Sequence, residues 1–112
     1  MPVLSIIVPV LNEAGLIAEV LQALAPLRAR DVEVIAVDGG SQDDTTALAR
    51  PHADRVMTAP RGRGSQMNAG AAAARARVLL FLHADTRLPD EADHLIIDGL
   101  ARSGRALSLI HI

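Results

Sequence analysis

The sequence predicts an α/β domain in three layers (α/β/α), with a mostly parallel, Rossmann-like sheet between two layers of helices. Two segments, residues 3–10 and 32–37, are apolar at nearly every position, which is typical of strands covered on both faces. Segments of helical periodicity separate such strands, and this alternation favours right-handed crossovers between parallel neighbours. With 112 residues the chain has room for one small domain.

The first helix is predicted after the strand at residues 3–10. Apolar residues recur at helical spacing over residues 16–24, with Asn12 as the expected N-cap. Pro26 is expected to end or kink this helix, because proline removes a backbone donor.

The second strand, residues 32–37, stops at the turn formed by residues 38–41. Ser41 and Asp44 have the spacing of a capping box, which predicts a short helix after this turn. Residues 55–58 form a shorter and weaker third strand in this interpretation.

The second half of the chain repeats the alternation. Residues 65–76 are rich in alanine and predict a helix, and residues 78–82 predict a fourth buried strand. Pro89 and the acidic residues after it start another helix, which Gly104 can stop. Residues 106–112 look like a further strand, an unusual place for such a sheet to finish, so we interpret the chain as a truncated fragment.

Composition excludes several classes of function. The 11 basic residues are all arginines and face 13 acidic ones, so the net charge of −2 disfavours binding to nucleic acid. The single Phe, without Tyr or Trp, offers no platform for stacked bases. The chain has no cysteine, no signal peptide and no apolar run long enough to span a bilayer, so we expect a cytoplasmic protein without a transmembrane segment.

Polar clusters follow three of the predicted strands, at residues 12–13, 38–41 and 83–85. Each alone reads as ordinary turn chemistry, but ligands of open α/β sheets bind beyond the carboxyl ends of the strands, where all three should meet. We expect Asp38 and Asp85 to share one cleft. Two close carboxylates repel each other unless a cation such as Mg²⁺ or Mn²⁺ bridges them to a diphosphate, so the pair indicates a nucleotide-diphosphate substrate.

Four ordered motifs carry a resemblance to a known family: residues 4–14 (LSIIVPVLNEA), 37–45 (VDGGSQDDT), 61–70 (RGRGSQMNAG) and 80–86 (LFLHADT). Together they resemble the opening of family 2 glycosyltransferases with the GT-A fold, and the last lies at the position of the family's D-x-D metal motif. The pattern is similar to a bacterial subgroup, the radical SAM/selenodomain-associated transferases. The resemblance covers roughly residues 3–88, most of the chain.

The resemblance implies an inverting transferase that moves a sugar from a nucleotide-diphosphate sugar to an unknown acceptor. Residues 1–112 would be the donor-binding part of a single GT-A domain whose acceptor half is missing. The divalent cation would be held by Asp85, with His83 as a second ligand. The implied nucleotide-sugar site consists of Pro9, Leu11, Asn12, Glu13, Asp38, Gly40, Ser41, Arg63, Gln66, Asn68, Gly70, His83, Ala84 and Asp85.

Two positions depart from the family's pattern. His83 replaces the first acidic residue of the D-x-D motif, which leaves the cation one carboxylate fewer. Leu11 stands where many relatives have an aromatic residue beside the base, so base stacking is lost. The resemblance implies that the general base lies beyond residue 112, so we expect the fragment to bind nucleotide and transfer nothing by itself.

Two alternatives remain open at this point. A dinucleotide-binding oxidoreductase would also place an acid like Asp38 after its second strand, but it requires G-x-G-x-x-G directly after the first strand. Residues 12–15 read NEAG instead. A non-catalytic nucleotide-binding module would use the same cleft without transfer.

Overall fold

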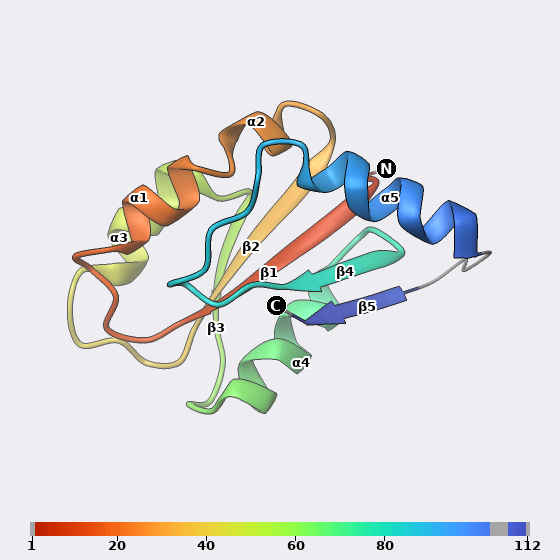
Figure 1. Ribbon diagram of the computed structural model, residues 1–112. Helices are drawn as coiled ribbons and strands as arrows, with labels where there is room; N and C mark the ends of the chain where they lie inside the picture. Colours follow the sequence, from red (N-terminus) through yellow and green to blue (C-terminus); the bar gives the residue numbers. More distant parts are fainter. Residues whose placement is uncertain (1, 104–107, 112) are drawn as a thin grey trace.

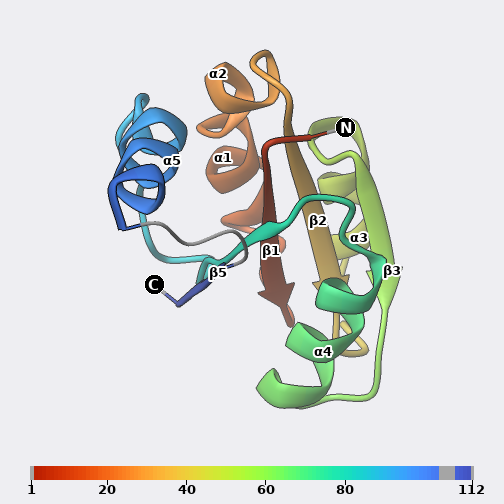
Figure 2. The same cartoon turned by 90° about the vertical axis from the view of Figure 1, so that its right-hand side faces the viewer.

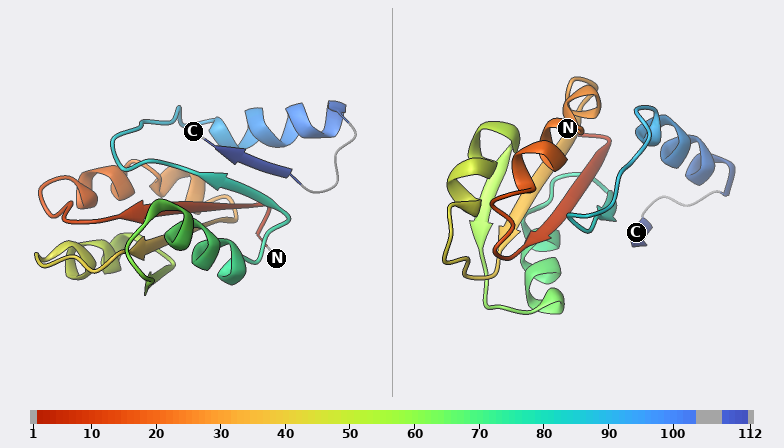
Figure 3. Two further views of the ribbon diagram at one scale, coloured as in Figure 1. Left: turned by 90° about the horizontal axis from the view of Figure 1, so that it is seen from below. Right: turned by 60° about the vertical axis from the view of Figure 1, so that its left-hand side comes forward.

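The computed structural model describes residues 2–103 and 108–111 and confirms the predicted class, a parallel sheet between helices (Figure 1). Five strands form one sheet in the order β3-β2-β1-β4-β5, and every neighbouring pair runs parallel. Figure 3 shows β5 at the opposite edge of this sheet from β3. The strands are β1 (Leu4–Val10), β2 (Val32–Asp38), β3 (Arg55–Thr58), β4 (Val78–Phe81) and β5 (Ser108–His111).

Helices cover both faces of the sheet (Figure 2). Residues of α1, α2, α3 and α5 belong to the core on one face, and residues of α4 pack against the other. The helices are α1 (Ile17–Gln22), α2 (Ala25–Arg28), α3 (Thr45–Ala49), the short 3₁₀ helix η1 (Arg50–His52), α4 (Arg63–Ala73) and α5 (Ala92–Ser103). Within the described ranges, none of these helices is long and apolar enough to cross a membrane.

The two cores explain why the strands are apolar at successive positions. Side chains alternate along β1, so Ile6 and Val8 lie in the core under α1 and α2, and Ile7 lies in the core under α4. All three are fully buried. A strand covered on both faces therefore needs apolar residues at even and odd positions alike.

Gly70 lets α4 approach the sheet closely. A Cβ at this position would stand 2.4 Å from Ile7 Cγ2 and 3.1 Å from Val37 Cγ2, closer than packed atoms allow. Gly70 is buried in this contact and does not line the cavity described below, so its role in the fold is packing rather than the framing of a sugar that the resemblance implied.

The start of α1 differs from the prediction. Leu16 precedes the helix without a side-chain cap, and the Oδ1 atom of Asn12, the expected N-cap, instead accepts a hydrogen bond from Gln42 N at 2.8 Å. The backbone of Asn12 has φ of 52°, which turns the chain away from the helix direction. Pro26 lies in the first turn of α2, where its missing N–H is harmless, and so a new helix starts there.

The predicted capping box at Ser41 and Asp44 is wrong. No side-chain hydrogen bond caps α3, and the Ser41 hydroxyl donates to the carboxylate of Asp38 instead. Asp43, not Ser41, accepts a hydrogen bond from the backbone N of Thr45, at 3.1 Å. The buried carboxylate of Asp38 takes the Ser41 hydroxyl because it must find donors of its own.

Most remaining boundaries lie close to those predicted. β3 matches its prediction, β5 lies within residues 106–112, and α4 begins two residues before the predicted start at residue 65. The predicted helix stop at Gly104 lies outside the described residues. The described α5 ends at Ser103, the residue before it.

Candidate functional site

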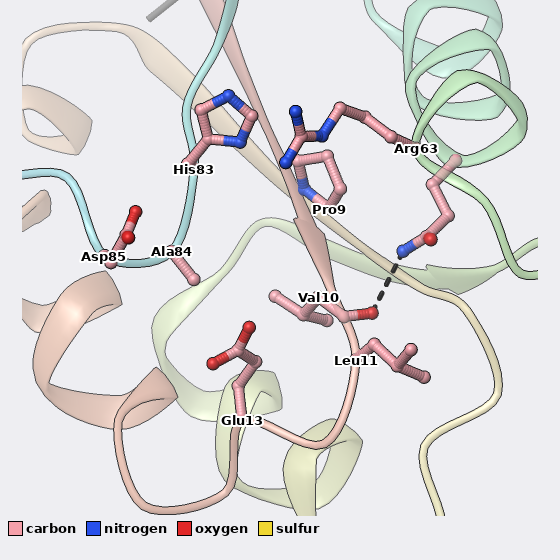
Figure 4. Close-up of a pocket in the computed structure, with 9 residues that line it drawn as sticks. Pro9, Val10, Leu11, Glu13, Arg63, His83, Ala84 and Asp85 are labelled. Atoms are coloured by element: carbon pink, nitrogen blue, oxygen red, sulfur yellow. Dashed lines mark hydrogen bonds between the residues drawn. The ribbon is translucent and has the colours of Figure 1, made fainter.

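A cavity of about 460 Å³ opens at the carboxyl ends of β1 and β4, beside the first turn of α4 (Figure 4). We call it the strand-end pocket. Parallel sheets place ligand sites at this end because the loops that leave the strands converge there. The pocket is lined by Pro9, Val10, Leu11, Glu13, Arg63, Gln66, His83, Ala84 and Asp85.

The sheet itself brings these segments together. β1 and β4 are parallel neighbours, and the backbone of Leu82 continues their pairing by donating to Ile7 O at 2.9 Å. His83 and Asp85 follow immediately, and therefore lie beside the end of β1 at Pro9. Arg63 is the first residue of α4 and reaches the pocket from the opposite core layer.

Charged groups of both signs line the pocket. Figure 4 shows the guanidinium of Arg63 extending toward His83, while the carboxylates of Glu13 and Asp85 lie on the other side of the pocket. Among the described residues no ion pair joins Arg63, Glu13 or Asp85 to a protein partner. These charges are therefore available to a ligand that carries an anionic group and to a cation that accompanies it.

Gln66 also lines the pocket, but its amide is bonded to the protein. Gln66 is 5% exposed, and its Nε2 donates to Val10 O at 3.0 Å and to Val37 O at 2.9 Å. Its Oε1 accepts from Gly62 N at 3.2 Å. Both N–H groups of the amide are thus used within the protein, and the contact with a nucleotide sugar that the resemblance implied could use them only if one of these bonds broke.

Asp38 does not join Asp85 in the pocket, contrary to the expectation of two carboxylates in one cleft. Asp38 is 2% exposed and is absent from the pocket lining, whereas Asp85 is exposed and lines it. The Asp38 carboxylate accepts hydrogen bonds from Gly40 N at 2.9 Å and Ser41 N at 2.8 Å, and from the Ser41 hydroxyl. A buried carboxylate needs such donors, and the turn after β2 supplies them.

Four more residues that the resemblance assigned to the site, besides Asp38 and Gly70, lie outside the pocket lining. Asn12 and Ser41 join the loops after β1 and β2, since Asn12 N donates to Ser41 Oγ at 2.8 Å. Gly40 is exposed in the turn after β2, and Asn68 is exposed on α4. Asn12 and Ser41 thus connect two loops beside the pocket and do not line it.

Val10 is the one pocket residue that the sequence analysis did not assign. It is the last residue of β1, and a final strand residue adjoins any ligand site at the carboxyl edge of a sheet. That position was the signal that could have identified it.

The donor set of the pocket fits a divalent cation that shares a ligand's phosphates. The described part of the chain contains no group of three or more His, Cys, Asp or Glu side chains able to hold a metal. The pocket does contain the imidazole of His83 and the carboxylate of Asp85. Hard cations in nucleotide sites use one or two protein carboxylates and take their other ligands from phosphate oxygens and water.

Comparison with known proteins identifies a family. Residues 5–112 match the sequence profile of the family described as Glycosyl transferase family 2. The chain is 37% identical over 101 residues to a PGL/p-HBAD biosynthesis glycosyltransferase of Mycobacterium bovis, which covers 84% of the chain and 39% of that protein. It is 29% identical over 99 residues to an uncharacterized glycosyltransferase of Rickettsia prowazekii, which covers 85% of the chain and 31% of that protein.

Solved structures agree with this assignment. The chain superposes on TarS of S. aureus with a TM-score of 0.78 and 25% identity, over 89% of the chain and 32% of TarS. For a mannosyltransferase of Pyrobaculum calidifontis in complex with GDP-Man and Mn²⁺, the TM-score is 0.75 and the identity 28%, over 89% of this chain and 32% of the mannosyltransferase. For glucosyl-3-phosphoglycerate synthase of Mycobacterium tuberculosis with Mn²⁺, UDP and glucosyl-3-phosphoglycerate, the TM-score is 0.70 and the identity 26%, over 96% of this chain and 41% of the synthase.

Proposed function

The chain belongs to glycosyl transferase family 2, and we propose that its strand-end pocket binds the nucleotide-diphosphate sugar from which a sugar is transferred. The observation that supports this most directly is the meeting of Arg63, His83 and Asp85 in one cavity at the carboxyl ends of β1 and β4. The mannosyltransferase and the synthase named above bind GDP-Man or UDP together with Mn²⁺, and the similarity to each extends over most of the present chain.

We assign the polar side chains of the pocket to the donor diphosphate. The guanidinium of Arg63 carries donors suited to phosphate oxygens, and an arginine in this role forms charge-assisted hydrogen bonds. Asp85, with His83 beside it, would hold a Mn²⁺ or Mg²⁺ ion. When bound, such an ion stabilises negative charge on a departing diphosphate.

The apolar side of the pocket suits the nucleoside. Pro9 and Leu11 come from the end of β1 and offer apolar surface without an aromatic ring. We propose that the base contacts these residues by van der Waals packing alone, which leaves both uridine and guanosine donors in consideration.

The chain spans 39% and 31% of the two curated relatives described above. We propose that it corresponds to their donor-binding part, and that the unknown acceptor and the general base of an inverting transfer belong to the portion that these residues do not match. On this proposal residues 1–112 bind nucleotide and give no measurable transfer alone. Membership of the radical SAM/selenodomain-associated subgroup and a cytoplasmic location stay predictions.

Thermal unfolding of the chain with UDP or GDP, each with and without Mn²⁺, tests this proposal. One of the two nucleotides is expected to raise Tm because a ligand that binds the folded state alone stabilises it, and NAD is expected to leave Tm unchanged. Stabilisation by NAD, with none by UDP or GDP, would overturn the donor site.

The variant Asp85→Asn tests the metal assignment in the same experiment. It should abolish the part of the Tm increase that depends on Mn²⁺ and keep any part that does not, since the amide is a weaker ligand for a hard cation. Asp90→Asn is the control, because Asp90 is exposed and lies outside the pocket. An undiminished Mn²⁺ response in Asp85→Asn would remove Asp85 from the site.

A further inference from the structure

We propose that Gln66 is a positioning residue that sets the place of Arg63 in the strand-end pocket, an inference that rests on the proposed function. Arg63 begins α4, and its side chain can meet a ligand reproducibly only if the first turn of α4 is held against the sheet. Gln66 lies in this turn and makes three side-chain hydrogen bonds that hold it there.

The first anchor joins α4 to two strands. Gln66 Nε2 donates to Val10 O and Val37 O, the carbonyl oxygens at the ends of β1 and β2. These partners are 56 and 29 residues away in the chain, so one side chain links three segments that are distant in sequence. Both N–H groups of the amide are thereby satisfied away from water.

The second anchor closes the turn on itself. Gly62 N donates to Gln66 Oε1 at 3.2 Å, and Gln66 N donates back to Gly62 O at 2.9 Å. Gly62 has φ of 137°, a backbone conformation that favours glycine, and it directly precedes Arg63. The reciprocal pair therefore fixes the residue from which the Arg63 backbone continues.

Gly39 supplies the space for this amide. A Cβ on Gly39 would stand 2.7 Å from Gln66 Oε1 and 2.9 Å from Cδ. The backbone N of Gly39 donates to Val10 O, the same oxygen that accepts from Gln66. Gln66 is thus seated in a gap that only glycine leaves open at this position.

An amide is the group that this seat requires. It offers two donors to the carbonyls and one acceptor to Gly62 N, whereas a carboxylate would face both carbonyls without a proton and a hydrocarbon would leave the partners unpaired. Because these hydrogen bonds fix the first turn of α4, Gln66 can affect binding of the nucleotide sugar without contacting it.

A double-mutant cycle between Gln66 and Arg63 tests this role through the Kd of UDP and of GDP, each with Mn²⁺, measured by calorimetry well below Tm. Gln66→Met is expected to weaken binding of the nucleotide that the unmodified chain prefers by about tenfold. In an Arg63→Ala background the same substitution should change the Kd little, because the group that it misplaces is already absent.

Ser5→Ala is the matched control for lost stability. It removes buried hydrogen bonds from the same strand, β1, at the end away from the pocket, and should lower Tm without changing the Kd. Should Gln66→Met leave too little folded protein, Gly39→Ala displaces the amide from the other side and should give the same pattern.

The outcomes separate the two proposals. If the unmodified chain binds neither nucleotide, the proposed function fails, and this inference fails with it. If it binds and Gln66→Met binds equally well, or loses the same factor with and without Arg63, the positioning role alone is wrong. A loss in Ser5→Ala as large as that in Gln66→Met also overturns it, since the effect would then follow stability.

Discussion

The two ends of the parallel sheet use charged residues in opposite ways. At the amino end, Glu33 is 7% exposed and accepts hydrogen bonds from Ser5 Oγ at 2.7 Å, Arg75 N at 2.9 Å and Arg75 Nε at 2.9 Å. At the carboxyl end, Arg63 and Asp85 line a cavity, and among the described residues neither forms an ion pair. Charges that the protein has already paired hold the fold together, and charges that it leaves unpaired can bind a ligand.

The cavities at the amino end support this reading. Six charged residues line them, and four of these are paired within the protein: Arg28 with Asp54 and Arg75 with Glu33. Asp31 and Arg55, the other two, form no ion pair among the described residues. Arg28 bonds Asp54 through two nitrogens, at 3.0 and 3.3 Å. A cavity lined by charged residues is therefore not by itself a binding site. Whether those charges are already paired within the protein decides whether they can bind a ligand.

Glu33→Ala should have the largest effect on stability and none on nucleotide binding. It leaves Arg75 N and Ser5 Oγ without their buried acceptor, which costs about 3 kcal/mol in the free energy of unfolding. Urea unfolding measures the loss. The control is Asp54→Asn, which weakens a partly exposed ion pair and should cost less than about 1 kcal/mol. A changed Kd for UDP or GDP in Glu33→Ala, at a temperature where the variant is folded, would contradict the claim that charges at the amino end serve the fold and not the site.

Arg63→Ala should show the reverse pattern. Loss of a charge-assisted contact to phosphate is expected to weaken nucleotide binding about tenfold, while the Tm without ligand stays nearly the same because Arg63 is exposed. Arg61→Ala is the matched control, since Arg61 is an exposed arginine two residues away that does not line the pocket. Equal losses in the two variants would mean that general positive charge, rather than the position of Arg63, attracts the nucleotide.

The smallest expected effect is a pH dependence of stability at the amino end. Burial raises the pKa of Glu33, but the hydrogen bonds from Arg75 N, Ser5 and the Arg75 guanidinium outweigh it and hold that pKa below its ordinary value of 4.5. The stabilisation is therefore complete above the pKa of the unfolded chain and is lost as the pH falls through the lower pKa of the folded state. Unfolding followed from pH 6 down to pH 3 should show this loss, and Glu33→Gln should make the slope shallower. An unchanged slope would exclude Glu33 as its source.

The sequence predicted the class of fold and most of its elements, and the structure brings together only some of the residues that were assigned to the site. Strands such as β1 were recognisable because burial on both faces makes every position apolar. His83, Asp85 and Arg63 were assigned to the site, and the structure brings all three to one pocket. Asp38 and Gln66 were assigned to it as well, yet the side chains of both are hydrogen-bonded to the protein's own backbone.

The difference between Asp85 and Asp38 has no local signature. Asp38 is the last residue of β2 and Asp85 follows β4 by a few residues, and each could serve a turn or a ligand. Asp38 turns inward because Gly40 N and Ser41 present donors to it, whereas Asp85 stays exposed. Only the folded arrangement of the turn shows which of the two carboxylates is already satisfied.

The sequence by itself determined the alternation of strands and helices, the parallel sheet, and the edge at which a site would form, because local periodicity and the handedness of crossovers leave few other arrangements. The tertiary structure decided which polar residues at that edge face the pocket and which brace it. Those roles depend on partners far apart in the chain, as with Gln66 and Val37 O, which are 29 residues apart. A buried polar group must be paired wherever its partner comes from, and no local pattern encodes that partner.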